Sequence, residues 1–502
     1  MKKKKWLYAF GLTVFTSGLV LGVQSYAATE QDKLPLKEIQ TFAEVYGQVK
    51  ANYYENTEDS KLIENAMKGM VSSLDPHSEY LTKEDFQGLK ELTSGKFGGL
   101  GMEITKENNA ISVISPIEDT PAARAGIKPG DLIIKIDGVS TKDMSTMEAS
   151  KKMRGEPGTH VVLTVLSKGR LAPANLDLER AIIHVRSVKS KLMVPDIGYI
   201  RVSTFSEETL ADFVKQLQSL VKENHGRPLK GLIFDLRNDG GGLLNAAVGV
   251  AGAFIPKGAV VVSTKGRNKI QQTVLKASPE FYRNPGENSN APDLLQGLPL
   301  GMKQVPIVVL INSGTASASE IVTGALQDYR RAVVVGTQSF GKASVQTVIP
   351  LQNEAGLKLT VALYYTPKDR SIQARGIIPD IEVKSAEDEL FDLHESDFGN
   401  HLSAPGAQKV QDAKEGDKTI SKLESIDPEA YQKKRKELQD KFRKQASFGY
   451  IPDPKTDIQL KKALDVIHNH AIWQKWLGAY VKNEAKVKKA EKKAEAAAKK
   501  DR

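Results

Sequence analysis

The residues around Lys342 suggest that this lysine takes part in chemistry. It lies in VVVGTQSFGKASVQ, residues 333–346, which nearly matches a phosphate-binding loop. Such a loop reads G-x-x-x-x-G-K-[ST] and opens a helix, because the Ser or Thr after the lysine binds Mg²⁺. Here Gly336 and Gly341 fit the pattern, but Ala343 follows the lysine and ASVQTVIP is rich in β-branched residues, which predicts a strand. A nucleotide site is therefore disfavoured.

A strand after Lys342 would suit a different role for its amine. Residues two apart in a strand share a face, so Lys342, Ser344 and Gln346 are predicted to point the same way. A lysine is a base only when it is neutral, and its reference pKa is about 10.4. Burial in an apolar pocket can lower that pKa by roughly 3–5 units. Gln346 could hold the amine in place without adding a charge.

Ser317 lies at a predicted strand-to-helix junction, INSGTASASEIVTGAL, residues 311–326. Ser317 and Glu320 fit the capping box S-x-x-E, so a serine here needs no function, and this segment alone favours a simple cap. The alternative is a nucleophile, because small neighbours let a carbonyl approach and N–H groups at a helix start can hold an oxyanion.

The segment DLRNDGGGLL, residues 235–244, places three glycines between a buried strand and a helix. Gly240, Gly241 and Gly242 could turn backbone N–H groups toward a ligand without obstruction by side chains. A tight turn that needs glycine for positive φ explains them equally well, so the segment alone leaves both interpretations open.

The elements from residue 196 onward alternate between apolar strands and helices, which predicts a mainly parallel sheet covered on both faces. The predicted strands include 259–264, the predicted helices include one capped by Ser206 and one at 318–329, and 277–301 is expected to be a surface loop. Strands ending near Asp235, Asn312 and Gly336 would share one sheet edge, where ligand sites form. This convergence favours catalysis, and since no histidine is close to Ser317 in sequence, a lysine is the candidate base.

The rest of the chain indicates several further regions. Residues 36–92 have helical periodicity and contain the turn LDPHSEYL, in which His77 is interpreted as structural because no second ligand lies at metal-site spacing. Short strands and glycine turns follow at 96–169, and an amphipathic helix is predicted at 458–480.

Composition limits the class of protein. The 502 residues carry a formal charge of +10, but residues 2–5 contribute four positive charges and residues 482–502 hold nine Lys/Arg against four Asp/Glu. The body is therefore nearly neutral, and nucleic acid is not an expected partner. The chain has no cysteine, which excludes disulfides and thiol catalysis.

The N-terminus predicts export. Four lysines precede an apolar run at 6–23, and Ser25 and Ala27 occupy the small positions of a cleavage site. Residues 1–27 are predicted to be removed, with an uncleaved membrane anchor as the alternative. The expected location is the periplasm or cell envelope.

These motifs together resemble the carboxyl-terminal processing proteases, the tail-specific serine peptidase family S41 with a PDZ domain. The resemblance rests on TASASEI, FGKASVQ, LRNDGGGLL, LDPHSEYL, YYTPKDRSIQARGIIPD and the spacing of 25 between Ser317 and Lys342, and it runs from about residue 36 to 384. It implies a crotonase/Clp-protease-like α/β core with an inserted PDZ β-sandwich or barrel and helical N- and C-terminal regions.

The resemblance also implies roles for individual residues. Ser317 would be the nucleophile, Lys342 the general base and Gln346 its orienting partner. The oxyanion hole would use N–H groups of Ala318 and of Gly241 or Gly242, although Asp239-Gly240 departs from the family's usual residues and leaves the choice of glycine open. Thr315 and Ala343 also depart from the family pattern without touching these roles. The PDZ carboxylate loop would be Gly99, Leu100, Gly101 and Met102.

The sequence thus predicts an exported serine endopeptidase that captures apolar C-termini of proteins and needs no metal or cofactor. A catalytically inactive PDZ scaffold is the alternative, and a homo-oligomer and an envelope activator or adaptor are possible partners. The predicted regions are the signal peptide, N-terminal helices, PDZ domain, peptidase core, linker, C-terminal helices and tail, at 1–27, 28–92, 93–172, 173–396, 397–430, 431–482 and 483–502.

Overall fold

The computed structural model describes most of the chain between residues 34 and 478. The described residues are 34–107, 110–167, 170, 172–385, 388, 392–403, 451–469, 471–473, 475–476 and 478. The predicted signal peptide and tail, and all but the start of the predicted linker, lie outside them. None of the helices in these ranges combines the length and the apolar character that a membrane crossing requires.

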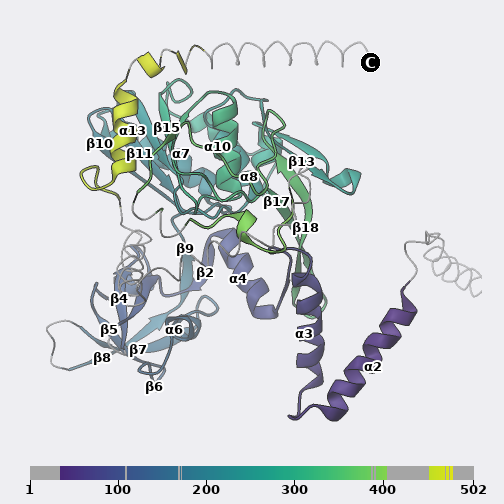
Figure 1. The fold of residues 1–502 in the computed structure, drawn as a ribbon. Coiled ribbons are helices and arrows are strands. Elements are labelled where there is room, and N and C mark those ends of the chain that lie inside the picture. Colours follow the sequence, from purple (N-terminus) through teal and green to yellow (C-terminus); the bar gives the residue numbers. More distant parts are fainter. Residues whose placement is uncertain are drawn as a thin grey trace, which may run out of the picture. The chain divides into compact units, whose positions relative to one another are not determined.

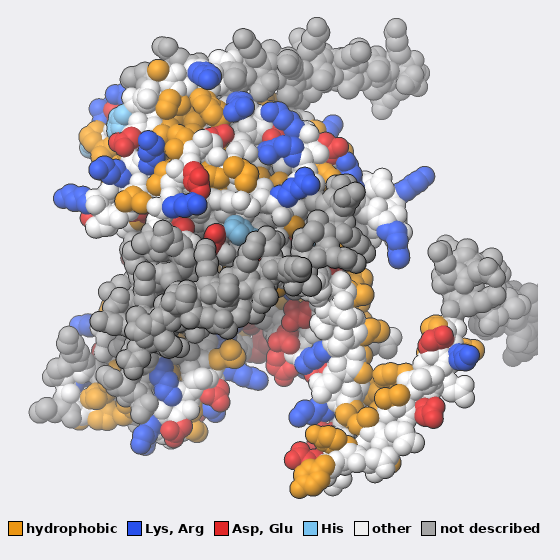
Figure 2. Space-filling view, in the orientation of Figure 1, with side chains coloured by type: hydrophobic (Ala, Val, Ile, Leu, Met, Phe, Trp, Pro, Cys, Tyr) orange, Lys and Arg blue, Asp and Glu red, His pale blue; other side chains and the backbone are white. Residues whose placement is uncertain are grey.

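The first unit of the chain ends at Met70, and its described part is helical, as predicted. It contains α2 (Leu36–Asn52) and nearly all of α3 (Asp59–Ser72). No residue of α2 is buried. Figure 2 shows hydrophobic side chains along this helix, and the exposed ones include Leu36, Ile39, Phe42, Val45 and Val49.

The second unit begins with elements that lead into an antiparallel sheet of short strands. The leading elements are β1 (Glu79–Leu81), α4 (Lys83–Ser94) and β2 (Lys96–Gly99). The sheet has the order β3-β4-β5-β7-β8, with β6 paired to β5. Its elements are β3 (Met102–Glu107), β4 (Ala110–Pro116), α5 (Pro121–Arg124), β5 (Leu132–Ile136), β6 (Val139–Ser140), α6 (Thr146–Met153), β7 (His160–Leu166) and β8 (Ala174–Glu179). β9 (Ala181–His184) then returns to pair with β2. The short strands predicted at 96–169 are confirmed.

The core of the second unit is a six-stranded sheet with the order β10-β11-β12-β15-β16-β19. Figure 1 labels β10, β11 and β15 of this sheet. Only the β10–β11 pair in this sheet is antiparallel, so the prediction of a mainly parallel sheet is confirmed. The strands are β10 (Val188–Val194), β11 (Ile197–Val202), β12 (Gly231–Asp235), β15 (Ile307–Ile311), β16 (Val333–Gly336) and β19 (Ile381–Glu382). The helices beside them are α7 (Thr209–Glu223), α8 (Leu244–Gly252), α10 (Ala318–Asp328) and α13 (Ile458–His468).

Strand β15 shows why this sheet needs cover on both faces. Successive side chains of a strand point to opposite faces, and every residue of β15 is apolar and buried. Ile307 and Val309 join the cluster that α7, α8 and α10 complete. Val308 and Leu310 join a second cluster with α13. A helix from far along the chain therefore covers the second face.

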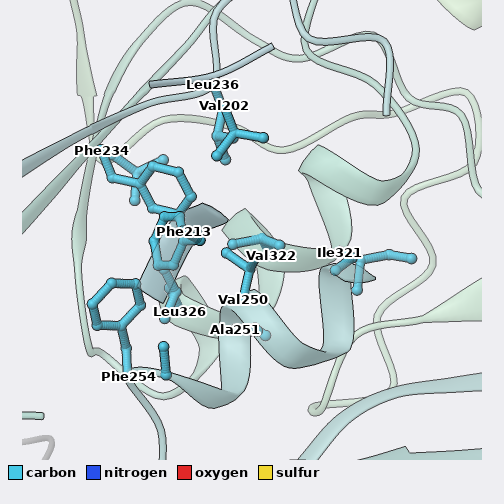
Figure 3. Packing of buried hydrophobic residues seen from close by; sticks show 14 of the residues in the cluster. Val202, Phe213, Phe234, Leu236, Val250, Ala251, Phe254, Ile321, Val322 and Leu326 are labelled. Atoms are coloured by element: carbon cyan, nitrogen blue, oxygen red, sulfur yellow. The ribbon is translucent and has the colours of Figure 1, made fainter. Parts of the chain in front are cut away.

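Three phenylalanine rings lie close together in the first cluster (Figure 3). Phe213 of α7 lies 5.3 Å from Phe234 of β12 and 5.8 Å from Phe254, measured between ring centroids. Phe234 and Phe254 are 6.2 Å apart. Ring pairs at these separations are favourable beyond the area that they bury, so the contacts hold α7 on the sheet.

A second, antiparallel sheet corrects the prediction for residues 259–264. That strand, β13 (Val260–Gly266), does not join the parallel sheet but pairs with β14 (Thr273–Lys276) and β18 (Gly356–Tyr365). β18 also pairs with β1 and β17 (Ser344–Pro350). The apolar start of β13 suggested a doubly covered strand, but its end is exposed at Lys265, as is common in antiparallel sheets with one open face.

Two helix boundaries also differ from the predictions. α7 begins at Thr209, and the backbone N–H of Ser206 donates to the Thr209 hydroxyl at 2.8 Å, so Ser206 belongs to the preceding turn and is not the cap. The helix predicted at 458–480 is interrupted: α13 ends at His468, where Asn469 has an extended backbone, and the described residues 471–473, 475–476 and 478 are helical again. The indole N–H of Trp473 donates to the carbonyl of Val466 at 2.9 Å.

Short elements complete the described chain. They are the 3₁₀ turns η2 (Lys269–Gln271), η3 (Leu294–Gly297) and η4 (Glu395–Asp397) and the single-turn helix α9 (Pro279–Tyr282). The expected loop at 277–301 contains α9 and η3 and is otherwise irregular.

Candidate active site

Ser317 is the residue between β15 and α10, and its backbone is strained. It has φ 55° and ψ −116°, whereas an ordinary N-cap residue has extended backbone with negative φ. A non-glycine residue in such a region costs roughly 1–3 kcal/mol, and such residues gather at functional sites. A simple cap therefore does not account for Ser317.

A buried carboxylate connects this elbow to the loop that carries Lys342. Glu320 is fully buried and accepts hydrogen bonds from the Ser339 hydroxyl (2.5 Å) and the backbone N–H groups of Gly341 (2.7 Å), Ser317 (2.8 Å) and Lys342 (2.9 Å). Burial raises the pKa of Glu320 to about 7, although these bonds oppose the rise. All four partners donate, so the site is built for the ionised carboxylate, which only accepts.

Lys342 and Gln346 are in contact, although the strand starts later than predicted. β17 begins at Ser344, and the Nζ of Lys342 donates to the Oε1 of Gln346 at 2.9 Å. The amide nitrogen of Gln346 donates to the Ser344 hydroxyl, also at 2.9 Å. Burial lowers the pKa of Lys342, and the charge of Lys358 lowers it further. The amine therefore loses its proton more readily than a solvated lysine does.

The glycine loop after β12 lies directly against the serine elbow. A Cβ placed on Gly241 would be 2.8 Å from the backbone nitrogen of Ala318, so only glycine fits there. Asn238 and Asn312 fasten the two segments: the Asn238 N–H donates to the Asn312 Oδ1 (2.9 Å), and the Asn312 amide donates to the Asn238 Oδ1 (2.8 Å). The predicted meeting of three strand ends is thus present, since β12, β15 and β16 are parallel neighbours.

The predicted oxyanion groups differ in availability. The N–H of Gly241 donates to the Oδ1 of Asp239 at 2.9 Å. The N–H groups of Gly242 and Ala318 have no hydrogen-bond partner within the described part of the chain. Asp239 is completely buried, its Oδ2 is unpartnered there, and burial raises its pKa to about 8. Burial therefore favours the neutral form of the Asp239 carboxyl.

The predicted PDZ loop lies between two strands. Gly99 ends β2, Met102 begins β3, and Leu100 between them is buried. Gly101 has φ 76°, and a Cβ on it would be 2.4 Å from Thr120, so a larger residue would displace the loop.

Sequence reasoning missed the residues that hold these segments together. Glu320 carried a signal, the capping box, but its bonds to Gly341 and Lys342 are made across 21 and 22 residues. The Tyr364 hydroxyl, which donates to the carbonyl of Ser317 at 3.1 Å, had no local signal. No group of three or more His, Asp or Glu side chains in the described ranges could hold a metal ion.

Comparisons with known proteins agree with this architecture. The chain matches the models of Peptidase family S41 at residues 196–383, the PDZ domain at 112–167 and the activating protease CtpB N-terminal domain at 17–85. The carboxy-terminal-processing protease of Bartonella bacilliformis is 40% identical over 463 residues, which cover 90% of this chain and 94% of that protein. The carboxy-terminal processing protease CtpA of Bacillus subtilis is 34% identical over 379 residues, 75% of this chain and 74% of that protein.

Among solved structures, the photosystem II D1 C-terminal processing protease aligns with 69% of this chain and 92% of its own, at 27% identity and a TM-score of 0.37. The family assignment rests on the sequence matches, which extend over nearly the whole chain. The chain belongs to the carboxy-terminal processing proteases of peptidase family S41, and it is a serine-type peptidase with a PDZ domain.

Proposed function

We propose that the protein is an exported endopeptidase that cleaves peptide bonds with a Ser317–Lys342 dyad. The neutral amine of Lys342 accepts the hydroxyl proton of Ser317 as its oxygen attacks the scissile carbonyl carbon. The resulting ammonium gives that proton to the departing amine, which leaves an ester on Ser317. Water, deprotonated by the same amine, then attacks the ester, and the ammonium returns the proton to the Ser317 oxygen as the acid is released.

The strained backbone of Ser317 is the observation that carries this proposal. A cap alone would relax to negative φ, so the positive φ of 55° requires another reason. The lowered pKa of Lys342 supports the role of base. Gln346 orients the amine through its 2.9 Å hydrogen bond.

The backbone N–H groups of Ala318 and Gly242 are the proposed oxyanion donors. Both are without partners in the described ranges, and preorganised donors stabilise the charge that develops on the carbonyl oxygen. The N–H of Gly241 is engaged by Asp239 in this conformation, so Gly241 serves by letting the loop approach Ala318.

Substrate selection is assigned to the PDZ domain. Among the described strands β3 is an edge strand that pairs with β4 alone, so an extended peptide can add beside it. Backbone N–H groups of residues 99–102 would hold the terminal carboxylate, and apolar terminal side chains would lie against the domain. The proposed substrates are proteins with free, apolar C-termini.

Export is supported by the composition of residues 1–27, with lysines, an apolar run and small residues at the cleavage site. Mass spectrometry of the mature protein from a cell-envelope fraction tests it. A mature N-terminus after Ala27 is expected, and an intact Met1 in that fraction contradicts removal.

The experiment for the dyad uses two peptides that differ only at the C-terminus, one a free acid with apolar end residues and the other its amide. The wild-type protein should cleave the acid faster, whereas Ser317→Ala and Lys342→Ala should abolish cleavage of both. Unchanged cleavage by either variant refutes the dyad, and no cleavage by wild type at any pH supports the inactive scaffold. Equal rates on the two peptides refute capture of the terminal carboxylate but do not affect the dyad.

A further inference from the structure

A chain of hydrogen bonds runs from Lys342 to the turn LDPHSEYL, for which the proposed mechanism has no use. The Nζ of Lys342 donates to the Oε1 of Gln346 (2.9 Å), whose amide nitrogen donates to the Thr360 hydroxyl (3.2 Å). That hydroxyl donates to the Oδ1 of Asp75 (3.0 Å). Gln346 and Thr360 are cross-strand partners on β17 and β18, and β1 pairs with β18 on its other side.

Asp75 sets the donor-to-acceptor direction of these hydrogen bonds. Burial alone would raise the pKa of Asp75, but hydrogen bonds from Ser78, His77 and Thr360 outweigh that effect and lower the pKa. Asp75 is therefore an ionised carboxylate, which can only accept. The hydroxyl hydrogen of Thr360 must point to Asp75, so the Thr360 oxygen can only accept from Gln346.

The direction decides which end of the Gln346 amide faces Lys342. An amide has a donor end and an acceptor end of nearly equal shape. Ser344 also contacts the amide nitrogen, but a hydroxyl can donate or accept, so Ser344 does not select an orientation. Thr360 does, because its hydrogen is committed to Asp75. With the NH₂ end reversed toward Lys342, the amide would donate into the lone pair that must take the Ser317 proton.

We propose that Asp75, acting through Thr360, is a positioning residue that keeps the carbonyl end of Gln346 on Lys342 and so leaves the amine lone pair free for Ser317. This inference rests on the Ser317–Lys342 dyad proposed above. The LDPHSEYL turn, distant in sequence, thereby sets the orientation of the Gln346 amide that holds the base.

Other charged groups also face Lys342 and shift its pKa. Lys358 lowers the pKa of Lys342, whereas Glu395, Glu320 and Asp75 raise it. His77 lies 2.7 Å from the buried Glu395 carboxylate, so it belongs to the same environment. A substitution at Thr360 changes the orientation of Gln346 while leaving all of these charges in place, which makes Thr360 the sharper site for a test than Asp75.

The test compares Thr360→Val, which keeps the shape but removes the hydroxyl, with Thr360→Ser, which keeps the hydroxyl. Thr360 is half-buried on a strand, where valine is well tolerated. Cleavage of the apolar-ended peptide is measured from pH 5 to 10. Thr360→Val should lower kcat about tenfold or more with little change in KM, since a misplaced base affects the transition state.

The pH profile separates positioning from a structural role. In Thr360→Val the NH₂ end of Gln346 can face Lys342 and disfavour its ammonium form, so the acid limb of kcat/KM should move to lower pH. Thr360→Ser should restore both the rate and the limb. A wild-type rate and limb in Thr360→Val, or an equal loss in Thr360→Ser, overturns the inference.

A double-mutant cycle tests the involvement of Asp75. Asp75→Asn should lower kcat alone but add little in the Thr360→Val background, because both act through the same amide. Losses that multiply fully overturn the role of Asp75. Thr82→Ala, which removes the cap of α4, is the control for lost stability and should leave the pH profile unchanged. If Lys342→Ala still cleaves the peptide, the dyad itself is refuted. That result is distinct from every outcome for the Thr360 and Asp75 variants.

Discussion

The backbone N–H groups of Ser317 and Lys342 donate to the same atom, the Oε2 of Glu320, at 2.8 and 2.9 Å. The strained elbow and the lysine loop thus share one buried acceptor, which fixes the positions of the proposed nucleophile and the proposed base relative to each other. The same carboxylate takes part in the capping box that begins α10. The capping box, which would be expected at a helix start even in a protein without catalytic function, therefore also organises the site.

Replacing Glu320 should separate these two segments. In Glu320→Gln an NH₂ group faces backbone donors, and each buried donor left unpaired costs about 1–3 kcal/mol. We expect the free energy of unfolding in urea to fall by about that amount and kcat to fall roughly tenfold to a hundredfold. Glu354→Gln, at an exposed turn, is the control and should change neither quantity. Full activity in Glu320→Gln contradicts the shared-acceptor role.

Two neighbouring glycines provide a matched pair for the loop beside Ser317. A Cβ on Gly241 would be 2.8 Å from Ala318 N and would need φ 97°, whereas a Cβ on Gly240 meets nothing within 4 Å. Gly241→Ala should therefore abolish most cleavage while Gly240→Ala stays near wild type, with circular dichroism confirming that both are folded. Comparable activities for the two variants show that the loop does not contribute to catalysis.

Asp239 predicts a pH-dependent loss of stability. Burial raises its pKa from 3.8 in the unfolded chain to about 8, so its favourable contribution is fully present below pH 3.8 and is lost as the pH rises toward 8. Asn cannot ionise, so the stability advantage of Asp239→Asn over wild type should grow from pH 5 to 8 and then level off. Urea unfolding at several pH values measures this advantage, with the exposed Asp177→Asn as control. An advantage independent of pH contradicts the buried neutral acid.

Lys358 should influence the pH at which the enzyme becomes active. Its positive charge helps to lower the pKa of Lys342, so Lys358→Gln should raise that pKa and move the acid limb of kcat/KM to higher pH. The exposed Lys384→Gln is the charge-matched control, since Lys384 is not among the groups that shift Lys342. A limb that stays in place, or that moves to lower pH, argues against Lys342 as the titrating base.

The parallel sheet and the meeting of its strand ends were predictable because apolar strands alternate with helices along the chain. The partner of β13 was not, since its apolar start is equally compatible with a parallel or an antiparallel neighbour. The packing of α13 on the second face of the sheet was also not predictable. An amphipathic pattern shows that a helix has a buried face without showing what that face packs against.

At the site, residue types and spacing were enough to single out Ser317, Lys342 and Gln346. The backbone of Ser317 was not predictable, because a capping box normally accompanies negative φ. Asp239 and Gly241 are recognisable in the sequence as part of the glycine loop, yet their mutual hydrogen bond depends on loop geometry. Thr360 and Asp75 became connected only through strand pairing between distant segments.

Trapping of the covalent intermediate would identify the nucleophile and its dependence on Lys342 in one experiment. The enzyme is mixed with an ester of an apolar-ended peptide, quenched in acid within milliseconds to seconds, digested and mapped by mass spectrometry. The account predicts an acyl group on Ser317 in the wild type and in Gly240→Ala, and none in Lys342→Ala. An acyl group on another residue, or undiminished acylation of Ser317 in Lys342→Ala, would contradict a Ser317–Lys342 dyad.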